Sequence, residues 1–259
     1  MSGTNPTGVT PEPAEIGPAE IGHAEIGHAE IGHEHNDLSG GWLRPAVFGA
    51  MDGLVTNIAL VAGVGGGGAS ARTIVLTGMA GLVAGAFSMA LGEFASVDTQ
   101  NNAVQAEVAV EREELRRHPD AEKAELIAMY QGMGLSEDIS RRLAEEVHNN
   151  PELAVREHIT AELGVNPDDQ PSPWTAGISS FFCFAVGALF PLLSYLLGVH
   201  SLLVSLAVGG IGLFGAGALV ARFTTRSWWF NGLRQLAFGA IAAGATFVVG
   251  SLIGISAAG

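Results

Sequence analysis

Five apolar stretches constrain this chain more than any other feature of its sequence. A helix needs about 20 mostly apolar residues to cross a bilayer, and the stretches that meet this requirement are 45–64, 73–97, 177–199, 202–221 and 236–257. Only short loops separate the first stretch from the second and the third from the fourth, so we expect each pair to form an antiparallel hairpin. The sequence therefore predicts an all-α protein with a five-span transmembrane helical bundle.

The charged residues are concentrated outside these stretches. Residues 98–173 hold 17 of the 26 acidic and seven of the 12 basic residues, whereas residues 174–259 hold three basic residues and no acidic one. An acidic segment attracts cations, and it argues against nucleic acid as a partner because phosphate binding requires clustered Lys and Arg. We therefore expect a membrane protein with an acidic helical insert between its second and third spans.

Composition divides the chain into four parts. Residues 1–40 form a tail that repeats PAEIG and HAEIG over residues 13–32, residues 41–97 hold the first two spans, residues 98–173 form the acidic insert, and residues 174–259 hold the last three spans. The tail has low hydrophobicity and recurring Gly and Pro, so we expect it to be disordered. Its His and Glu side chains could collect divalent metal weakly, or the tail could be an inert acidic segment.

Basic residues near the span ends indicate the orientation. The positive-inside rule places the loops richest in Lys and Arg in the cytosol, and a cytosolic amino terminus leaves only Arg72 on the opposite side. The residues that then share the cytosolic side are Arg44, Arg112, Arg116, Arg117, Arg222, Arg226 and Arg234. The acidic insert is then cytosolic and the carboxyl terminus is outside. High Ala and Gly content in a short chain favours a bacterial protein, and hence the cell (plasma) membrane.

Two acidic residues interrupt the apolar stretches, Asp52 in the first and Glu93 near the end of the second. A charge near the bilayer centre costs at least a few kcal/mol, which makes such residues functional candidates. Met89 lies one helical turn before Glu93, and a thioether beside a carboxylate suits a transient Fe²⁺ or Mn²⁺ site. The alternatives are that both acids lie at the membrane interface and that Met89 only packs.

The insert carries metal-ligating side chains at helical spacing. The second stretch continues as a polar helix to about residue 117, and further helices are predicted after Pro119, Ser136 and Pro151. Paired carboxylates on successive helices, with a His and a Glu four residues apart, resemble the metal sites of helical bundles. A solvated charged face is the alternative. The pairs are Glu111 and Glu114, Glu122 and Glu125, and His158 and Glu162.

Three stretches are together similar to a known family. They are FGAMDGLVTN (residues 48–57), GAFSMALGEFASV (residues 85–97) and, within the insert, NPELAVREHITAELGV (residues 150–165). Over about residues 42–258 the chain resembles the vacuolar iron transporter family, as a bacterial-type member without a ferritin-like domain. The resemblance implies a homodimer of five-span protomers that moves Fe²⁺, and in some members Mn²⁺, out of the cytosol in exchange for protons, with the path between protomers.

The resemblance also implies roles for single residues. Asp52 and Met89 would be ligands along the path, and Glu93 would be the carboxylate of the family's SM-x-x-GE pattern. The glutamates that would bind metal in the cytosolic insert are Glu111, Glu114, Glu122, Glu125 and Glu162. His158 and Ile159 stand where family members often carry Met and Glu. An imidazole can replace a thioether as a ligand, but Ile159 cannot coordinate a metal.

Two other functions fit the same residues. One is a manganese exporter of the same fold, because oxygen ligands suit Mn²⁺ as well as Fe²⁺. The other is a membrane-anchored metal sensor or scaffold that binds cations without transporting them. An enzyme is not expected, since no paired catalytic motif lies at membrane depth. The expected partners are divalent metal ions, protons, the lipid bilayer and a second copy of the chain, with no cofactor beyond the transported or bound metal.

Overall fold

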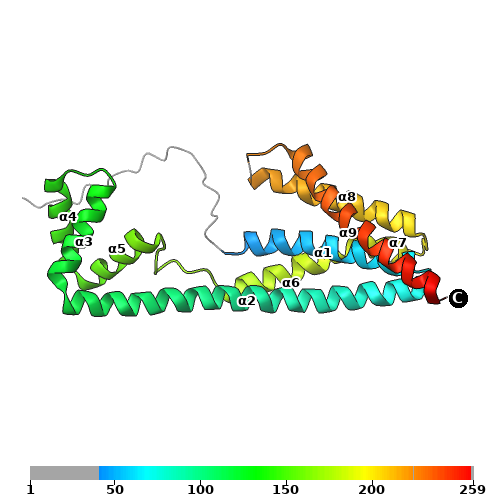
Figure 1. Cartoon of the computed structure of the whole chain (residues 1–259), viewed down its shortest axis with the longest axis horizontal. Helices are drawn as coiled ribbons and strands as arrows, with labels where there is room; N and C mark the ends of the chain where they lie inside the picture. The colour runs from blue at the N-terminus through cyan, green and yellow to red at the C-terminus, as the bar shows by residue number, and fades with distance from the viewer. Residues whose placement is uncertain (1–40, 224, 258–259) are drawn as a thin grey trace, which may run out of the picture. The chain divides into compact units, whose positions relative to one another are not determined.

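The computed structural model describes residues 41–223 and 225–257, so the expectations for the tail lie outside the described residues. Every regular element within those two ranges is helical, which confirms the all-α prediction (Figure 1). In chain order the elements are α1 (Leu43–Gly66), α2 (Ala71–Arg117), α3 (Pro119–Gly132), α4 (Glu137–His148), α5 (Pro151–Leu163), α6 (Pro173–Leu189), the 3₁₀ turn η1 (Phe190–Leu192), α7 (Leu193–Leu196), α8 (Leu202–Val220), the 3₁₀ turn η2 (Ala221–Phe223) and α9 (Trp228–Ala257).

Within the described residues, five helical segments are long and apolar enough to cross a membrane, as predicted, and the chain is an integral membrane protein. These segments are α1, α2, Pro173–Leu196, Leu202–Phe223 and the part of α9 from Trp228 to Gly254. The third span begins earlier than hydropathy indicated, because the Ser172 hydroxyl caps α6 and Pro173 fills its first turn, where a missing N–H costs nothing. The fifth also begins earlier, since Arg234 lowers the local hydropathy without interrupting α9.

Helix α1 packs against α2, α6, α8 and α9. Its approach to α6 is close enough that a Cβ atom added at Gly53 or Gly187 would collide with the backbone oxygen of Phe184 or Ala50, respectively. Small residues permit this approach in lipid, where apolar burial alone does not drive helices together. The glycine content of the spans therefore serves close helix packing here.

The two predicted hairpins differ in the structure. Helices α1 and α2 pack against each other, as expected for a short connection. Helix α8, in contrast, contacts η1 and α7 near the turn, but most of its packing is with α9 and α1. Gly209 and Gly212 of α8 face Ile58 and Leu54 of α1. The second hairpin is therefore open along most of its length, because α8 packs on α1.

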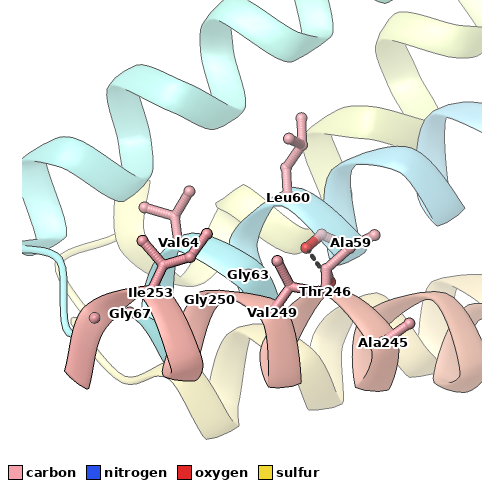
Figure 2. A pocket seen from close by; sticks show the side chains of 11 residues that line it. Ala59, Leu60, Gly63, Val64, Gly67, Ala245, Thr246, Val249, Gly250 and Ile253 are labelled. Carbon is pink, nitrogen blue, oxygen red and sulfur yellow. Dashed lines mark hydrogen bonds between the residues drawn. The ribbon is translucent and has the colours of Figure 1, made fainter. Parts of the chain in front are cut away.

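A crevice of about 620 Å³ lies between α1 and α9 (Figure 2). The Thr246 hydroxyl donates a hydrogen bond to the carbonyl oxygen of Ala59 over 2.6 Å and so ties the two helices together. The other lining residues are small or apolar, and none of the lining residues carries a charge. The crevice therefore lacks the ligands that a divalent cation needs.

The insert has its own apolar core. Leu126 and Tyr130 of α3 pack with Ala144 and Val147 of α4 and with Ala154 of α5. Helix α5 also packs along α2, so the polar half of α2 forms one wall of the insert. This arrangement brings side chains from α2, α3 and α5 to one place.

Candidate metal centre

One helix connects the membrane part of the chain with the insert. Helix α2 runs for 47 residues and ends before Pro119, whose ring disfavours the helical conformation of the preceding residue. Glu93 and Glu111 both lie on this helix, and at about 1.5 Å per residue they are roughly 27 Å apart along its axis. Figure 1 shows α2 as one uninterrupted helix.

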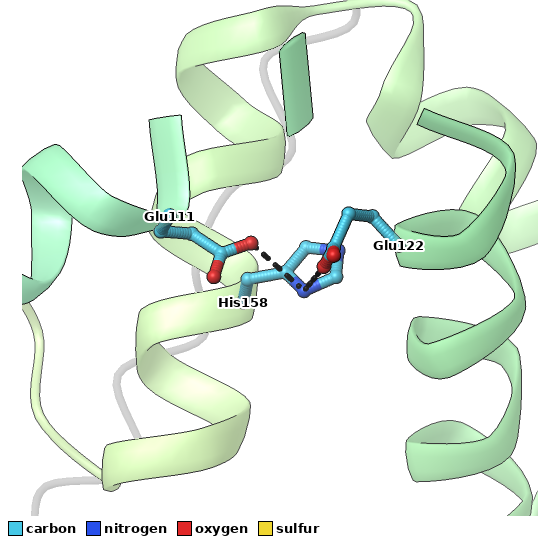
Figure 3. Close-up of side chains that lie close together, drawn as sticks. All are labelled: Glu111, Glu122 and His158. Carbon is cyan, nitrogen blue, oxygen red and sulfur yellow. Dashed lines mark ion pairs between the residues drawn. The ribbon is translucent and has the colours of Figure 1, made fainter. Parts of the chain in front are cut away.

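His158 on α5 lies within ion-pair distance of three carboxylates. Its Nδ1 atom is 3.2 Å from Oε1 of Glu111, 3.7 Å from Oε2 of Glu122 and 3.6 Å from Oε1 of Glu162. Figure 3 shows Glu111 of α2 and Glu122 of α3 pointing toward the same ring nitrogen. One ligand atom from each of Glu111, Glu122 and His158 falls within 4.8 Å of the other two. The structure thus brings together four side chains that the sequence selected.

The cluster lies largely inside the insert. His158 is 0% exposed, Glu111 7% and Glu122 9%. The side chain of Glu162 is 32% exposed. Glu162 therefore forms the solvent-facing edge of a cluster of candidate metal ligands that is otherwise buried.

Burial and mutual repulsion disfavour ionisation of these carboxyl groups. Burial, and then the charges of Glu162, Glu122 and other neighbouring glutamates, raises the pKa of Glu111 to about 7. Burial also raises the pKa of Glu122 and of Glu162 above the ordinary value. The pKa of His158 is lowered, chiefly by burial, so its neutral ring has a lone pair to offer. A divalent cation would relieve this repulsion.

Several polar atoms of the cluster are buried without a hydrogen-bond partner among the described residues. They are Oε1 of Glu111 and both ring nitrogens of His158. Buried polar atoms in folded proteins nearly always have partners, so each exception needs an explanation. Carboxylates together with a neutral imidazole are ligands that Fe²⁺, Mn²⁺ and Zn²⁺ accept. The donor set therefore fits a divalent transition metal.

Glu114 and Glu125 lie around this cluster rather than within it. The charges of both contribute to the raised pKa of Glu111. Glu125 is exposed, however, and the Glu114 carboxylate lies 3.9 Å from Nε2 of His118. Their assignment as metal ligands stays a prediction.

Ile159 packs in the apolar core of the insert. It is 1% exposed and contacts Val108 and Val155 in a buried cluster. The side chain that cannot coordinate a metal is thus used for packing, while its neighbour His158 reaches the carboxylates.

The residues predicted to line the path lie on α1 and α2. Asp52 is partly buried and accepts a hydrogen bond from the Thr56 hydroxyl over 3.4 Å. Glu93 is 8% exposed, and its Oε2 atom has no hydrogen-bond partner within the described ranges. Met89 packs in an apolar cluster with residues of α6. No hydrogen bond or ion pair within those ranges joins Asp52, Met89 and Glu93, and their role as path ligands stays a prediction.

Sequence reasoning missed one residue beside the cluster. His148 is the last residue of α4, and its ring centroid lies 5.5 Å from that of His158. No local pattern marks His148, because only the packing of α4 on α5 brings the two rings together.

Comparison with known proteins agrees with this architecture. The model of the VIT family matches residues 43–251. The chain is similar to Vacuolar iron transporter 1 of Oryza sativa subsp. japonica, at 27% identity over 217 residues that cover 83% of this chain and 86% of that protein. It is also similar to the Vacuolar iron transporter of Acanthamoeba castellanii, at 32% identity over 191 residues that cover 70% of this chain and 69% of that protein. The chain is a membrane transporter that belongs to the VIT family.

Proposed function

We propose that this transporter exports Fe²⁺, and also Mn²⁺, from the cytosol in exchange for protons, and that it works as a homodimer. The observation that carries the proposal is the continuity of α2. This one helix bears the buried carboxylate of Glu93 in its membrane half and, in the insert, Glu111, which lies 3.2 Å from His158. In this scheme the insert captures the ion, which then passes to Glu93, Met89 and Asp52.

The identity of the cargo is supported by the donor set and by the relatives. Two carboxylates and an imidazole suit a borderline divalent metal. The similar proteins of Oryza sativa and Acanthamoeba castellanii are named vacuolar iron transporters. Iron is therefore the first cargo to test, with Mn²⁺ as its competitor.

Exchange for protons is supported by the chemistry of carboxylate ligands. A carboxyl group must lose its proton before it binds a metal, so protons and metal ions compete for it. The pKa of Glu111, raised to about 7, supports a competition near neutral pH at the capture site. In the same way, protons from an acidic compartment on the side of the membrane opposite the cytosol would displace the metal from the carboxylates of Glu93 and Asp52.

The orientation and the membrane belong to the same proposal. The basic residues favour a cytosolic amino terminus and a cytosolic insert. We place the protein in the cell membrane, although the names of its relatives refer to the vacuole. Exposed large apolar side chains on the membrane half of α2, among them Leu76, Phe87 and Leu91, leave a face that lipid or a second protomer can cover.

The test is metal flux into liposomes that contain the purified protein. Fe²⁺ or Mn²⁺ is added outside under anaerobic conditions, and uptake is followed with a trapped metal-sensitive dye, with and without an acidic lumen. We expect uptake of both ions, faster for Fe²⁺, acceleration by the acidic lumen, and proton release that accompanies uptake. Flux that is insensitive to the pH gradient would overturn the exchange, and flux of Mn²⁺ alone would favour the manganese exporter.

Two variants separate the path from the surface. Asp52→Ala removes a predicted path ligand, and we expect it to abolish most of the flux. The matched control is Asp138→Ala, because Asp138 is an exposed residue of α4 that pairs with Arg142 over 3.1 Å. Full transport by Asp52→Ala would refute the path assignment. Metal binding by the insert without flux in the wild type would identify a sensor or scaffold instead.

A further inference from the structure

Two neighbouring imidazoles in the insert have buried nitrogen atoms without hydrogen-bond partners. The ring of His148 meets that of His158 edge to face, with the ring centroids 5.5 Å apart and the ring planes at 77°. In the part of the chain that the structure describes, Nε2 of His148 and both ring nitrogens of His158 lack a partner. Both rings therefore have hydrogen-bonding capacity that no described residue uses.

The tautomer of His148 follows from its contact with the backbone. Its Nδ1 atom lies 2.9 Å from the carbonyl oxygen of Ala144. A carbonyl oxygen can only accept, so Nδ1 must carry the hydrogen and donate it. With its hydrogen on Nδ1, the neutral ring of His148 holds a lone pair at Nε2. Nε2 of His148 is thus a buried acceptor without a donor.

Once His158 binds a metal through Nδ1, its Nε2–H group requires a hydrogen-bond acceptor. Its Nδ1 atom faces the carboxylates of Glu111, Glu122 and Glu162. When Nδ1 donates its lone pair to a metal, the neutral ring carries its hydrogen on Nε2. Metal-ligating histidines almost always donate this second N–H to an acceptor, which fixes the tautomer and the orientation of the ring.

We propose that His148 is a positioning residue of the metal centre, whose Nε2 accepts a hydrogen bond from Nε2–H of His158 and so directs Nδ1 of His158 at the metal. The two rings are neighbours, with centroids 5.5 Å apart, but in this structure their Nε2 atoms do not form a hydrogen bond with each other, so the rings must turn toward each other when His158 binds the metal. This inference rests on the proposed capture of metal by the insert. It adds a residue from α4 to a site otherwise built from α2, α3 and α5.

An imidazole ligand whose orientation is fixed also affects which metals the site selects. Nitrogen ligands suit Fe²⁺ and other transition metals, whereas Mg²⁺ and Ca²⁺ prefer oxygen. By orienting the His158 ring and making its Nδ1 a more basic ligand, His148 favours transition metals over the abundant hard cations.

The experiment uses the full-length protein in detergent, in a background where the tail histidines are changed to Gln so that they bind no probe. These histidines are His23, His28, His33 and His35. Two substitutions are compared: His148→Gln, whose amide oxygen can replace the acceptor at Nε2, and His148→Phe, which keeps a ring but has no acceptor. Both lose the hydrogen bond to Ala144, so that loss cancels in the comparison.

Mn²⁺ affinity is measured from the electron paramagnetic resonance signal of the unbound ion. We expect His148→Phe to weaken binding about 10- to 100-fold, the usual loss when a partner of a metal ligand is removed, and His148→Gln to keep most of the affinity. The exposed residue His200 provides the control His200→Phe, which should bind like the wild type. Amide hydrogen exchange in α5 confirms that each variant is folded.

A spectroscopic measurement separates positioning from general stability. With less than one equivalent of Cu²⁺, pulsed electron paramagnetic resonance detects the remote nitrogen of a bound imidazole, whose quadrupole coupling responds to hydrogen bonding at its N–H. We expect this coupling to match between wild type and His148→Gln and to shift in His148→Phe. An unchanged coupling and affinity in His148→Phe, or no imidazole signal in the wild type, would overturn the inference. The liposome flux assay decides the proposed function separately.

Discussion

The Nδ1 atom of His158 lies 3.2 Å from Oε1 of Glu111, which joins α5 to α2 inside the insert. Both side chains are buried, and no Lys or Arg within the described ranges forms an ion pair with Glu111. A buried carboxylate without a cationic partner carries an unfavourable charge. The insert therefore has a place for a cation at the point where its helices meet.

The stability of the metal-free insert should fall as the pH rises through 7. The pKa of the Glu111 carboxyl group is about 7 in the folded protein, against an ordinary value of 4.5, so the folded state binds the extra proton. This contribution is fully present below pH 4.5 and is lost as the pH rises through 7, and it amounts to at most about 3 kcal/mol in the free energy of unfolding. Amide hydrogen exchange of α3 and α5 at pH 5 and pH 8 measures it, and equal protection at both pH values would contradict it.

Metal should reverse this pH effect. A ligand that binds only the folded state stabilises it by about 2.7 kcal/mol when present at 100 times its dissociation constant. We expect Mn²⁺ to increase amide protection at pH 8 and to have little effect at pH 5, where protons occupy the carboxyl groups. Equal protection by Mg²⁺ at the same concentration would show that the site does not select transition metals.

Replacing Glu111 by Gln should weaken metal binding while it stabilises the metal-free protein. Changes next to metal ligands already cost about 10- to 100-fold in affinity, so loss of a ligand is expected to cost at least as much. Calorimetric titration with Mn²⁺ at pH 7.5 measures the affinity. The control is Glu137→Gln, since Glu137 is exposed and pairs with Arg141. Similar affinities for the two variants would remove Glu111 from the site.

Ile159→Ala should destabilise the insert without removing a metal ligand. Truncating a buried isoleucine costs about 2 to 5 kcal/mol, whereas Ile159→Val should cost about 0.5 to 1.5 kcal/mol. Hydrogen exchange of α5 reports the loss, because Ile159 packs with Val108 and Val155. Ile159→Glu would bury a charge in that core, and tighter metal binding by this variant than by the wild type would show that position 159 faces the cluster after all.

Gly187→Ala should separate α1 from α6 and destabilise the membrane part of the protein. A Cβ atom at this position would collide with the backbone oxygen of Ala50, which cannot move aside as a side chain can. We expect a lower thermal unfolding midpoint in detergent. Gly215→Ala is the matched control, because no atom lies within 4 Å of its added Cβ. Equal midpoints for both variants would show that the contact does not support the fold.

The spans and the long helix were predictable because their signals are local. Hydropathy located the five spans, and the absence of Gly and Pro after Asp98 predicted that α2 continues to Arg117. The starts of α6 and α9 were predicted four and eight residues too late, since capping by Ser172 and tolerance of Arg234 do not appear in hydropathy. The open second hairpin was also missed, because it depends on how α8 packs against α1.

The candidate site divides in the same way. Helical spacing and family resemblance selected Glu111, Glu122, His158 and Glu162, which the structure brings together. They could not show that Glu125 stays exposed, because both Glu122 and Glu125 look alike in the sequence of α3. His148 was invisible for a stronger reason, since its position beside His158 arises only from tertiary packing.

The unbroken course of α2 has an angular consequence. Successive residues of an α-helix are rotated by about 100°, so positions 93 and 111 are separated by roughly five complete turns. Glu93 and Glu111 therefore project from nearly the same side of α2. A single-residue insertion between them would rotate one carboxylate by about 100° about the helix axis relative to the other. The number of residues between Glu93 and Glu111 therefore sets the relative direction of the two carboxylates as well as the distance between them.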